Sequence, residues 1–295
     1  MPKRNIDELR ERMLKSAKEG IRNAYESEEY ALMQAINAHI ETSRSYNLNF
    51  ERLSEWYGIY FPEIRMGNPN TLAALIIAVG NEQKPSKEKI VEAVKDADKA
   101  EAIYSKAVET IGRRMNDDET KAIVRFARLS NEMAASLDEL DSYIKAAANR
   151  LLPNTTYLTE PKIAAELLGR AGSMERLATM PAGTVQLLGA EKALFKHIKF
   201  GSRPPKYGVL FKLPEIGTAP REIRGKIARV YATKICIALK ADHFSKNFIA
   251  EKLKKDLELS IKRIREKPIV PKKEFPRREF RRQDFRKGGG RKGRR

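Results

Sequence analysis

The sequence predicts an all-α protein: a long antiparallel coiled-coil hairpin with a helical tip, a compact helical domain, and a disordered basic C-terminal tail. In two long segments, apolar residues recur at alternating spacings of three and four, the pattern of a coiled-coil seam. Shorter apolar segments with helical spacing follow them, and the composition changes abruptly at Pro268. We therefore place the domains at 1–152, 153–267 and 268–295.

The first long segment, residues 5–60, is predicted to form one helix that ends near Tyr57, because Gly58 and Pro62 oppose its continuation. Its seam consists of Leu32, Ile36, His39, Ser43, Tyr46, Phe50 and Leu53. The predicted tip holds a short apolar helix within 63–85 and a helix over 86–111, which Ser86 would cap.

A second long helix is predicted over 119–151, with Asp117 and Asp118 at its N-terminus, where negative charge suits the helix dipole. Its seam consists of Phe126, Ser130, Met133, Leu137, Leu140, Ile144, Ala147 and Leu151. In the next domain, helices are expected near 161–171, 173–179, 190–200, 220–241 and 244–266. The apolar stretch 207–213 alternates too little to predict a strand.

The tail is rich in Pro, Lys, Arg and Gly, with Phe275, Phe280 and Phe285 spaced by five. High charge and low hydrophobicity predict disorder. Cations that contact phosphate and aromatic rings that stack on bases suit RNA. The alternative is a tail that serves solubility or localisation.

Net charge is +19 and the isoelectric point is near 9.9, which favours a nucleic acid or another anionic partner. The charge is concentrated in two regions. Residues 262–295 carry sixteen Lys/Arg against four Asp/Glu, and residues 186–232 carry ten against three. No signal peptide or membrane span is expected, since the longest apolar run is only 71–80.

The sequence predicts no catalytic function, cofactor or metal site. The three histidines, His39, His197 and His243, are far apart, and the one cysteine, Cys236, cannot form an intrachain disulfide or a Cys-rich zinc site. No GxSxG, P-loop or GxGxxG motif occurs.

The most distinctive stretch is 186–208, QLLGAEKALFKHIKFGSRPPKYG. Gly189 is predicted to precede a helix whose first N–H groups can meet a phosphate. The spacing of Lys192, Lys196 and Lys199 predicts one basic stripe, and Ala193, Leu194 and Phe195 are expected to anchor the helix to the core. The alternative is an ordinary helix with a solvated basic face.

Two further basic groups follow this helix. Lys206 and Tyr207 follow a stiff Pro-Pro pair, and a cation beside an aromatic ring there suits contact with the end of an RNA stem. The second of these groups lies near the start of a predicted helix and consists of Arg221, Arg224, Lys226 and Arg229. Cations there oppose the helix dipole, so an external anion is a reasonable inference and a plain surface face is the alternative.

The blocks LLGAEKALFKHI, PPKYGVLF and RGKIARVYATKICIALKADHFS resemble the Nop domain, as does the lead-in PNTTYLTEPKIAAELLGRAGSMERLATMPAGTVQ. EWYGIYFPEI at 55–64 matches the preceding helical domain of the same proteins. The resemblance runs from about residue 20 to 265 and is to an archaeal member of the Nop family, the scaffold of box C/D small ribonucleoproteins. Eukaryotic nucleolar proteins and a spliceosomal relative share this architecture.

The resemblance implies that the domain recognises a kink-turn RNA together with a small kink-turn-binding protein already on it. It places Gly189, Ala190, Glu191 and Lys192 at the RNA–protein junction. It places Lys196, Lys199, Arg203 and Lys206 along the RNA stem, and Arg224, Lys226 and Arg229 on the adjoining basic face.

Further partners follow from the same resemblance. They are a box C/D guide RNA, a second copy bound through the coiled coil, and fibrillarin, which methylates RNA 2′-hydroxyls with S-adenosylmethionine. The protein would lie in the cytoplasm of an archaeon or the nucleolus of a eukaryote.

Two departures from the family pattern stand out. Residue 1 lies close to the first long helix, so we expect the N-terminal fibrillarin-binding domain to be absent and any contact with fibrillarin to be indirect. Lys196 stands where many relatives have Arg, which keeps the charge without the planar fork. The alternatives are a helical protein-interaction adaptor and a spliceosome-like scaffold without a methylation role.

Overall fold

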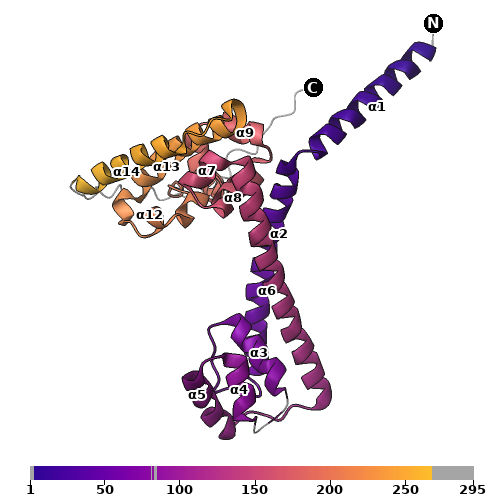
Figure 1. Ribbon diagram of the computed structural model, residues 1–295, viewed down its shortest axis with the longest axis vertical. Helices are drawn as coiled ribbons and strands as arrows, with labels where there is room; N and C mark the ends of the chain where they lie inside the picture. The colour runs from indigo at the N-terminus through magenta and orange to yellow at the C-terminus, as the bar shows by residue number, and fades with distance from the viewer. Residues whose placement is uncertain (1–2, 81, 83–84, 268–295) are drawn as a thin grey trace, which may run out of the picture. The chain divides into compact units, whose positions relative to one another are not determined.

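The computed structural model describes residues 3–80, 82 and 85–267, and every regular element in these ranges is a helix (Figure 1). This confirms the all-α prediction. The chain divides into two compact units: unit 1 is Met1–Met33 with Ala146–Arg295, and unit 2 is Gln34–Lys145. The predicted disordered tail, 268–295, lies outside the described residues. No described helix combines the length and apolar character that a membrane crossing requires.

The first predicted helix is in fact two helices, α1 (Lys3–Tyr25) and α2 (Glu28–Tyr57). The prediction of one continuous helix missed a start signal at Ser27, whose Oγ accepts a hydrogen bond from the Glu29 N–H at 3.4 Å. Glu28 and Glu29 add negative charge to the first turn of α2. The large apolar side chains of α1 are exposed: Ile6, Leu9, Met13, Leu14, Ile21 and Tyr25.

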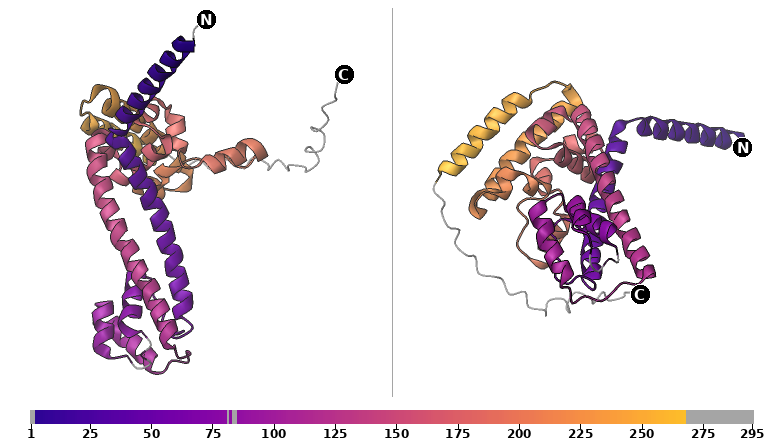
Figure 2. Two further views of the ribbon diagram at one scale, coloured as in Figure 1. Left: turned by 90° about the vertical axis from the view of Figure 1, so that its right-hand side faces the viewer. Right: turned by 60° about the horizontal axis from the view of Figure 1, so that its bottom comes forward.

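In unit 2, residues 34–57 of α2 run beside residues 117–145 of α6 (Asp117–Leu151), as the views in Figures 1 and 2 show. His39 Nε2 lies 2.9 Å from Asp141 Oδ1, and the rings of Trp56 and Phe126 are 6.2 Å apart. All predicted seam residues of both helices are buried or half-buried. That the two helices wind around each other as a coiled coil stays a prediction.

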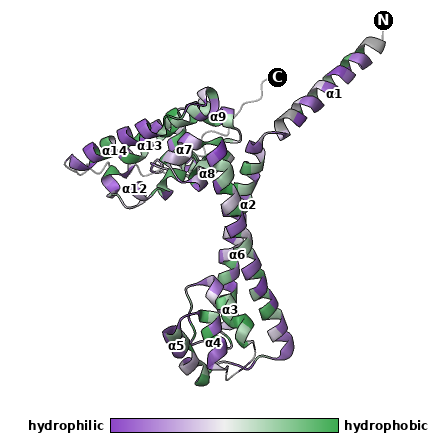
Figure 3. Cartoon of the chain, in the orientation of Figure 1, coloured by the Kyte–Doolittle hydropathy of each residue, from purple (hydrophilic) through white to green (hydrophobic). Residues whose placement is uncertain are grey.

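The tip of unit 2 contains three helices: α3 (Pro69–Val79), α4 (Lys87–Val94) and α5 (Ala97–Val108). The apolar α3, green in Figure 3, packs Leu72 and Ile76 into a core with Leu53 and Tyr57 of α2. Ser86 caps α4 as predicted.

The helix predicted over 86–111 is divided in the structure. Lys95 takes a left-handed conformation (φ 55°) after α4, and Asp96 then caps α5 with its side chain. A left-handed residue ends an α-helix, so one helix becomes two.

Unit 1 is built around α13 (Arg221–Lys240), which buries Ile227, Tyr231, Ile235 and Leu239 and packs against α10 and α14. The other elements of the unit, besides α1 and the ends of α2 and α6, are α7 (Pro153–Leu158), α8 (Pro161–Ala171), α9 (Met174–Thr179), α10 (Ala182–Leu187), α11 (Glu191–Phe200), η1 (Val209–Lys212), α12 (Pro214–Gly217), η2 (Ala241–Ser245) and α14 (Ala250–Glu266).

Most of the predicted helices of this domain are confirmed to within one residue. The exception is the last, which begins at Ala250 because the chain first forms a π-helical turn, η2, ending at the left-handed Lys246 (φ 57°). The stretch 207–213 contains the 3-10 helix η1 and no strand.

Buried Asp242, 1% exposed, ties η2 to the start of α7. Its Oδ1 accepts hydrogen bonds from the backbone N–H and Nδ2 of Asn154, both at 2.8 Å. Its Oδ2 accepts hydrogen bonds from the Thr155 N–H at 3.0 Å and hydroxyl at 2.7 Å. The carboxylate thereby satisfies free N–H groups of the first turn of a helix, where negative charge is favourable.

We expect Asp242→Ala to lower the free energy of unfolding of unit 1 by about 3 kcal/mol, because it leaves several buried donors without an acceptor. Asp256→Ala is the control. It removes a carboxylate that forms only a partly exposed ion pair with Lys234, so it should cost at most about 1 kcal/mol. Urea unfolding followed by circular dichroism measures both, and equal midpoints would contradict the role of Asp242.

Candidate nucleic-acid interface

The bend between α10 and α11 requires glycine at position 189. Gly189 has φ +87°, a conformation that L side chains rarely adopt. A Cβ added there would lie 2.8 Å from Val209 Cγ2 and 3.1 Å from Arg170 Nε. Backbone conformation and lack of space therefore both exclude a side chain.

The N–H of Gly189 itself is not free to meet a phosphate. It donates to Glu191 Oε1 at 2.6 Å, so this side chain turns back toward the bend. Glu191 Oε2 lies 3.8 Å from Arg170 Nη1. No side chain caps α11 at Ala190, the residue that precedes it. The N-terminus of α11 thus remains available, whereas the Gly189 amide serves the bend itself.

The basic loop after α11 is bound to the same bend by backbone hydrogen bonds. The Gly208 N–H donates to the Gln186 carbonyl at 2.9 Å, and the Val209 N–H donates to the Leu188 carbonyl at 2.7 Å. Gln186 Nε2 donates to the Lys206 carbonyl at 2.6 Å. At Gly208 a Cβ would lie 1.8 Å from the Leu188 oxygen, so this close approach also requires glycine. The sequence analysis did not single out Gly208.

The predicted basic side chains of α11 and the loop lie on the surface. They are Lys192, Lys196, Lys199, Arg203 and Lys206. Within residues 3–80, 82 and 85–267, none of them forms an ion pair. Lys199 Nζ lies over the rings of Phe195 and Phe200, 5.7 and 5.4 Å from their centroids.

The prediction that Ala193, Leu194 and Phe195 anchor α11 in the core is wrong. No residue of α11 is buried, and Phe195 and Ile198 are 61% and 74% exposed. The hydrogen bonds of the backbone around Gly189 hold the helix at its N-terminal end instead. An exposed face that is both apolar and basic results.

At the start of α13, the predicted cations differ in their surroundings. Arg221, Lys226 and Arg229 are exposed and form no ion pair within the described part of the chain. Arg224 is half-buried: its Nε donates to the Ala219 carbonyl at 2.6 Å, and its guanidinium lies 5.5 Å from the centroid of Phe211. Arg224 therefore has a packing role that the sequence did not reveal.

The loop and the start of α13 come together at Lys206. A Cβ built on Gly225 would lie 3.6 Å from Lys206 Cδ, so the stem of this lysine passes over the helix between Arg224 and Lys226. Tyr207 stacks on Phe211, with ring centroids 4.9 Å apart. The structure thus joins two of the predicted basic groups.

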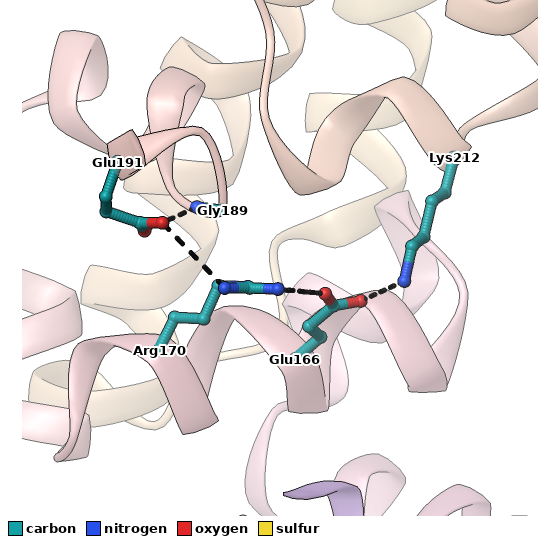
Figure 4. Close-up of polar contacts among 5 residues, drawn as sticks. All are labelled: Glu166, Arg170, Gly189, Glu191 and Lys212. Carbon is teal, nitrogen blue, oxygen red and sulfur yellow. Dashed lines mark hydrogen bonds and ion pairs between the residues drawn. The ribbon is translucent and has the colours of Figure 1, made fainter. Parts of the chain in front are cut away.

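An ion-pair network around the buried Glu166, next to the bend, was not predicted (Figure 4). Glu166 of α8 has a side chain only 6% exposed, and it binds Arg170 Nη2 at 2.9 Å and Lys212 Nζ at 2.5 Å. The spacing of four residues between Glu166 and Arg170 indicates a helical pair. Nothing in the local sequence indicates Lys212, which is 46 residues away.

The histidines and the cysteine lie apart from this surface or from one another. His39 contacts Asp141, His197 Nδ1 lies 2.5 Å from the Ser202 carbonyl oxygen, and the His243 ring packs on Phe244. The described residues contain no cluster of His, Cys, Asp or Glu that could hold a metal ion. Burial raises the pKa of the Cys236 thiol to about 11, so this group is protonated near neutral pH.

A family model described as "Nop: snoRNA binding domain, fibrillarin" matches residues 39–263. The chain belongs to the Nop family. It is 34% identical over 268 residues to an uncharacterised NOP5 family protein of Methanocaldococcus jannaschii, covering 89% of this chain and 64% of that protein.

Eukaryotic relatives match over a similar region. Nucleolar protein 56 of Homo sapiens is 32% identical over 235 residues, which cover 77% of this chain and 40% of that protein. Nucleolar protein 58 of Schizosaccharomyces pombe is 34% identical over 217 residues, which cover 72% and 42%. The chain thus spans between 40% and 64% of the length of these three relatives.

A chain from a crystal structure titled as a fibrillarin/Nop5p complex is 24% identical, with a TM-score of 0.45. The match covers 90% of this chain and 80% of that chain. Similarity at this level carries no conclusion about the present site.

We expect Gly189→Ala to lower the free energy of unfolding of unit 1 by about 1–3 kcal/mol, because the positive φ and the contact with Val209 both disfavour a methyl group. Gly183→Ala in α10 is the matched control. Nothing lies within 4 Å of its Cβ position, so alanine there should be neutral or stabilise the helix by up to about 1 kcal/mol. Thermal unfolding by circular dichroism compares the two, and equal stability of both variants would refute the requirement for glycine at 189.

Proposed function

We propose that the protein is a non-enzymatic RNA-binding scaffold of a box C/D-type ribonucleoprotein. Its Nop domain recognises a kink-turn RNA together with the small protein that binds kink-turns. Family membership supports the snoRNA-binding part of this proposal, because the matching family model bears that description over most of the chain. The finer claim of composite recognition is supported by the character of the surface around α11.

The observation that carries the RNA-binding proposal is a set of exposed cations that no carboxylate of the described residues pairs. Lys192, Lys196, Lys199, Arg203 and Lys206 follow one another on α11 and its loop. Ion pairs form readily elsewhere in the same unit, as at Glu166 and Asp256. A row of cations that the described chain leaves unpaired gains most from an external polyanion, because phosphate binding releases condensed counter-ions.

Recognition of a protein as well as RNA is supported by the apolar side chains between these lysines. Phe195, Ile198 and Phe200 are 61%, 74% and 49% exposed. Phe195 and Phe200 could also stack on unpaired bases, but the aliphatic Ile198 suits neither phosphate nor base, whereas a protein surface can bury it and gain about 25 cal/mol per Å². A mixed surface of this kind suits an RNA with a protein already bound beside it.

The proposal assigns methylation to fibrillarin, a separate protein that would use S-adenosylmethionine. This chain would guide the reaction by holding the guide RNA. Two copies would associate through α2 and α6, and the assembly would act in the archaeal cytoplasm or, in a eukaryote, in the nucleolus. Purification from the native cell, with sequencing of the RNA that accompanies the protein, tests this wider assignment.

Composite recognition predicts weak binding to bare kink-turn RNA and binding at least about tenfold tighter once the kink-turn protein is present. A gel shift at fixed salt, with the bare RNA and with the RNA bound by the kink-turn protein, measures the ratio of the two affinities. Equal affinity for the two forms would refute composite recognition.

Lys192→Ala should weaken the complex by about tenfold without loss of helicity, because it removes one exposed charge at the start of α11. Lys252→Ala on α14 is the control, since it removes the same charge from another exposed position. Equal effects of the two variants would indicate that only total charge matters.

The cations of the C-terminal segment make a separate contribution. Deletion of 268–295 should weaken binding to all RNA sequences alike and reduce the slope of log affinity against log salt, because phosphate contacts carry no sequence information. Titrations at several salt concentrations measure the slope for the full and shortened chains. An unchanged slope would show that this segment does not contact RNA.

A protein-interaction adaptor is the second candidate, favoured by the exposed apolar side chains of α1, which include Ile6, Leu9 and Met13. It predicts that partners stay bound after ribonuclease treatment. Loss of all partners after that treatment would favour the RNA scaffold.

A further inference from the structure

Glu191 is an unexpected residue in a surface that would bind phosphate. It lies next to Lys192 and on the same short helix as Lys196 and Lys199. A carboxylate that faced the RNA there would repel it. In the structure the carboxylate instead faces the bend, where Oε1 accepts the Gly189 N–H and Oε2 lies 3.8 Å from Arg170 (Figure 4).

We propose that Glu166 and Arg170 are positioning residues for the RNA-binding surface, which fix the Gly189 bend, and thereby the start of α11, through Glu191 and through the packing of Arg170 against Gly189. This inference rests on the proposed function, because it concerns the same surface. It assigns binding to the exposed cations, and it assigns to Glu191 the role of holding the loop.

The anchor of this network is the buried Glu166. Its carboxylate accepts charge-assisted hydrogen bonds from Arg170 Nη2 at 2.9 Å and from Lys212 Nζ at 2.5 Å. A buried carboxylate needs such partners, and the loss of one leaves its charge incompletely compensated. Since Glu166 is fixed within α8, the planar guanidinium of Arg170 is held in one orientation.

Arg170 then reaches the bend in two ways. Its Nη1 faces the Glu191 carboxylate, and its Nε and Cζ lie 3.1 and 3.3 Å from the position that a Cβ on Gly189 would take. The pair with Glu191 alone is too exposed and too long to contribute much. Together with the packing of Arg170 against Gly189, it restricts the bend.

The network has no net charge, because two cations, Arg170 and Lys212, balance two carboxylates, Glu166 and Glu191. Its attraction for phosphate is therefore small to first order, unlike that of the lysine row. Shape control and phosphate attraction can consequently be separated by mutation.

Arg170→Gln and Lys212→Gln form a matched pair for the first experiment. Both remove one positive charge and one partner of Glu166, but only Arg170 reaches Glu191 and Gly189. The amide resonance of Gly189 in the free full-length chain reports on the bend without RNA or protein partners. We expect it to shift in Arg170→Gln, toward its position in Glu191→Ala, and to stay unchanged in Lys212→Gln. An equal shift of the Gly189 amide resonance in the two glutamine variants would overturn the inference.

The second experiment measures affinity for the kink-turn RNA with its bound protein. Arg170→Gln should lower it by about tenfold, and Lys212→Gln by no more than about twofold, with the same salt slope in both. Glu166→Gln adds sensitivity, because it makes the surface more positive. Charge alone predicts tighter binding for this variant, and positioning predicts weaker binding.

The two proposals can fail separately. If Arg170→Gln binds as wild type while Lys192→Ala binds weakly, the positioning role is wrong and the interface stands. If Lys192→Ala binds as wild type while the Gly189 resonance shifts as expected, the interface is wrong and the effect of Arg170 on the bend stands.

Discussion

The close approach of two backbone segments, 186–189 and 206–209, determines the rest of the candidate interface. Their hydrogen bonds bring the carbonyls of Gln186 and Leu188 against Gly208 and Val209. The approach is so tight that neither Gly189 nor Gly208 has room for a side chain. Because α11 buries no residue of its own, this junction fixes where the helix begins. The basic loop returns to the same point, so its cations follow from the same constraint.

Charge in unit 1 is divided between two uses. Arg170 and Lys212 pair with Glu166 next to the junction, because the Glu166 carboxylate is buried and would be costly to leave unpaired. The lysines of α11 are exposed to solvent, where it costs little that no described residue pairs with them. A polyanion gains from the second set without disturbing the first. Glu191 belongs to the internal set although it stands among the lysines in the sequence.

Most of the fold could be predicted, because long helices depend on the spacing of apolar residues within one segment. The bounds of α8, α9, α11 and α13 follow from that local signal. Helix interruptions were harder to predict. The break at Ser27 and the left-handed Lys95 each depend on one or two residues within an otherwise continuous apolar pattern. The 3-10 helix η1 depends on the tertiary contact of Val209 with Leu188, which no local pattern encodes.

The candidate site was predicted as a set of residues but not as an arrangement. Spacing identified the lysines, since exposed cations need no partner within the chain. It failed for Phe195, because an apolar residue at helical spacing looks the same whether it faces a core or a partner that is not part of the chain. The sequence also did not reveal the backbone partners of Arg224 and Glu191, which are the Ala219 carbonyl and the Gly189 N–H. A charged side chain can thus support a binding surface by holding its backbone in place, and only the positions of the backbone atoms reveal which charges do so.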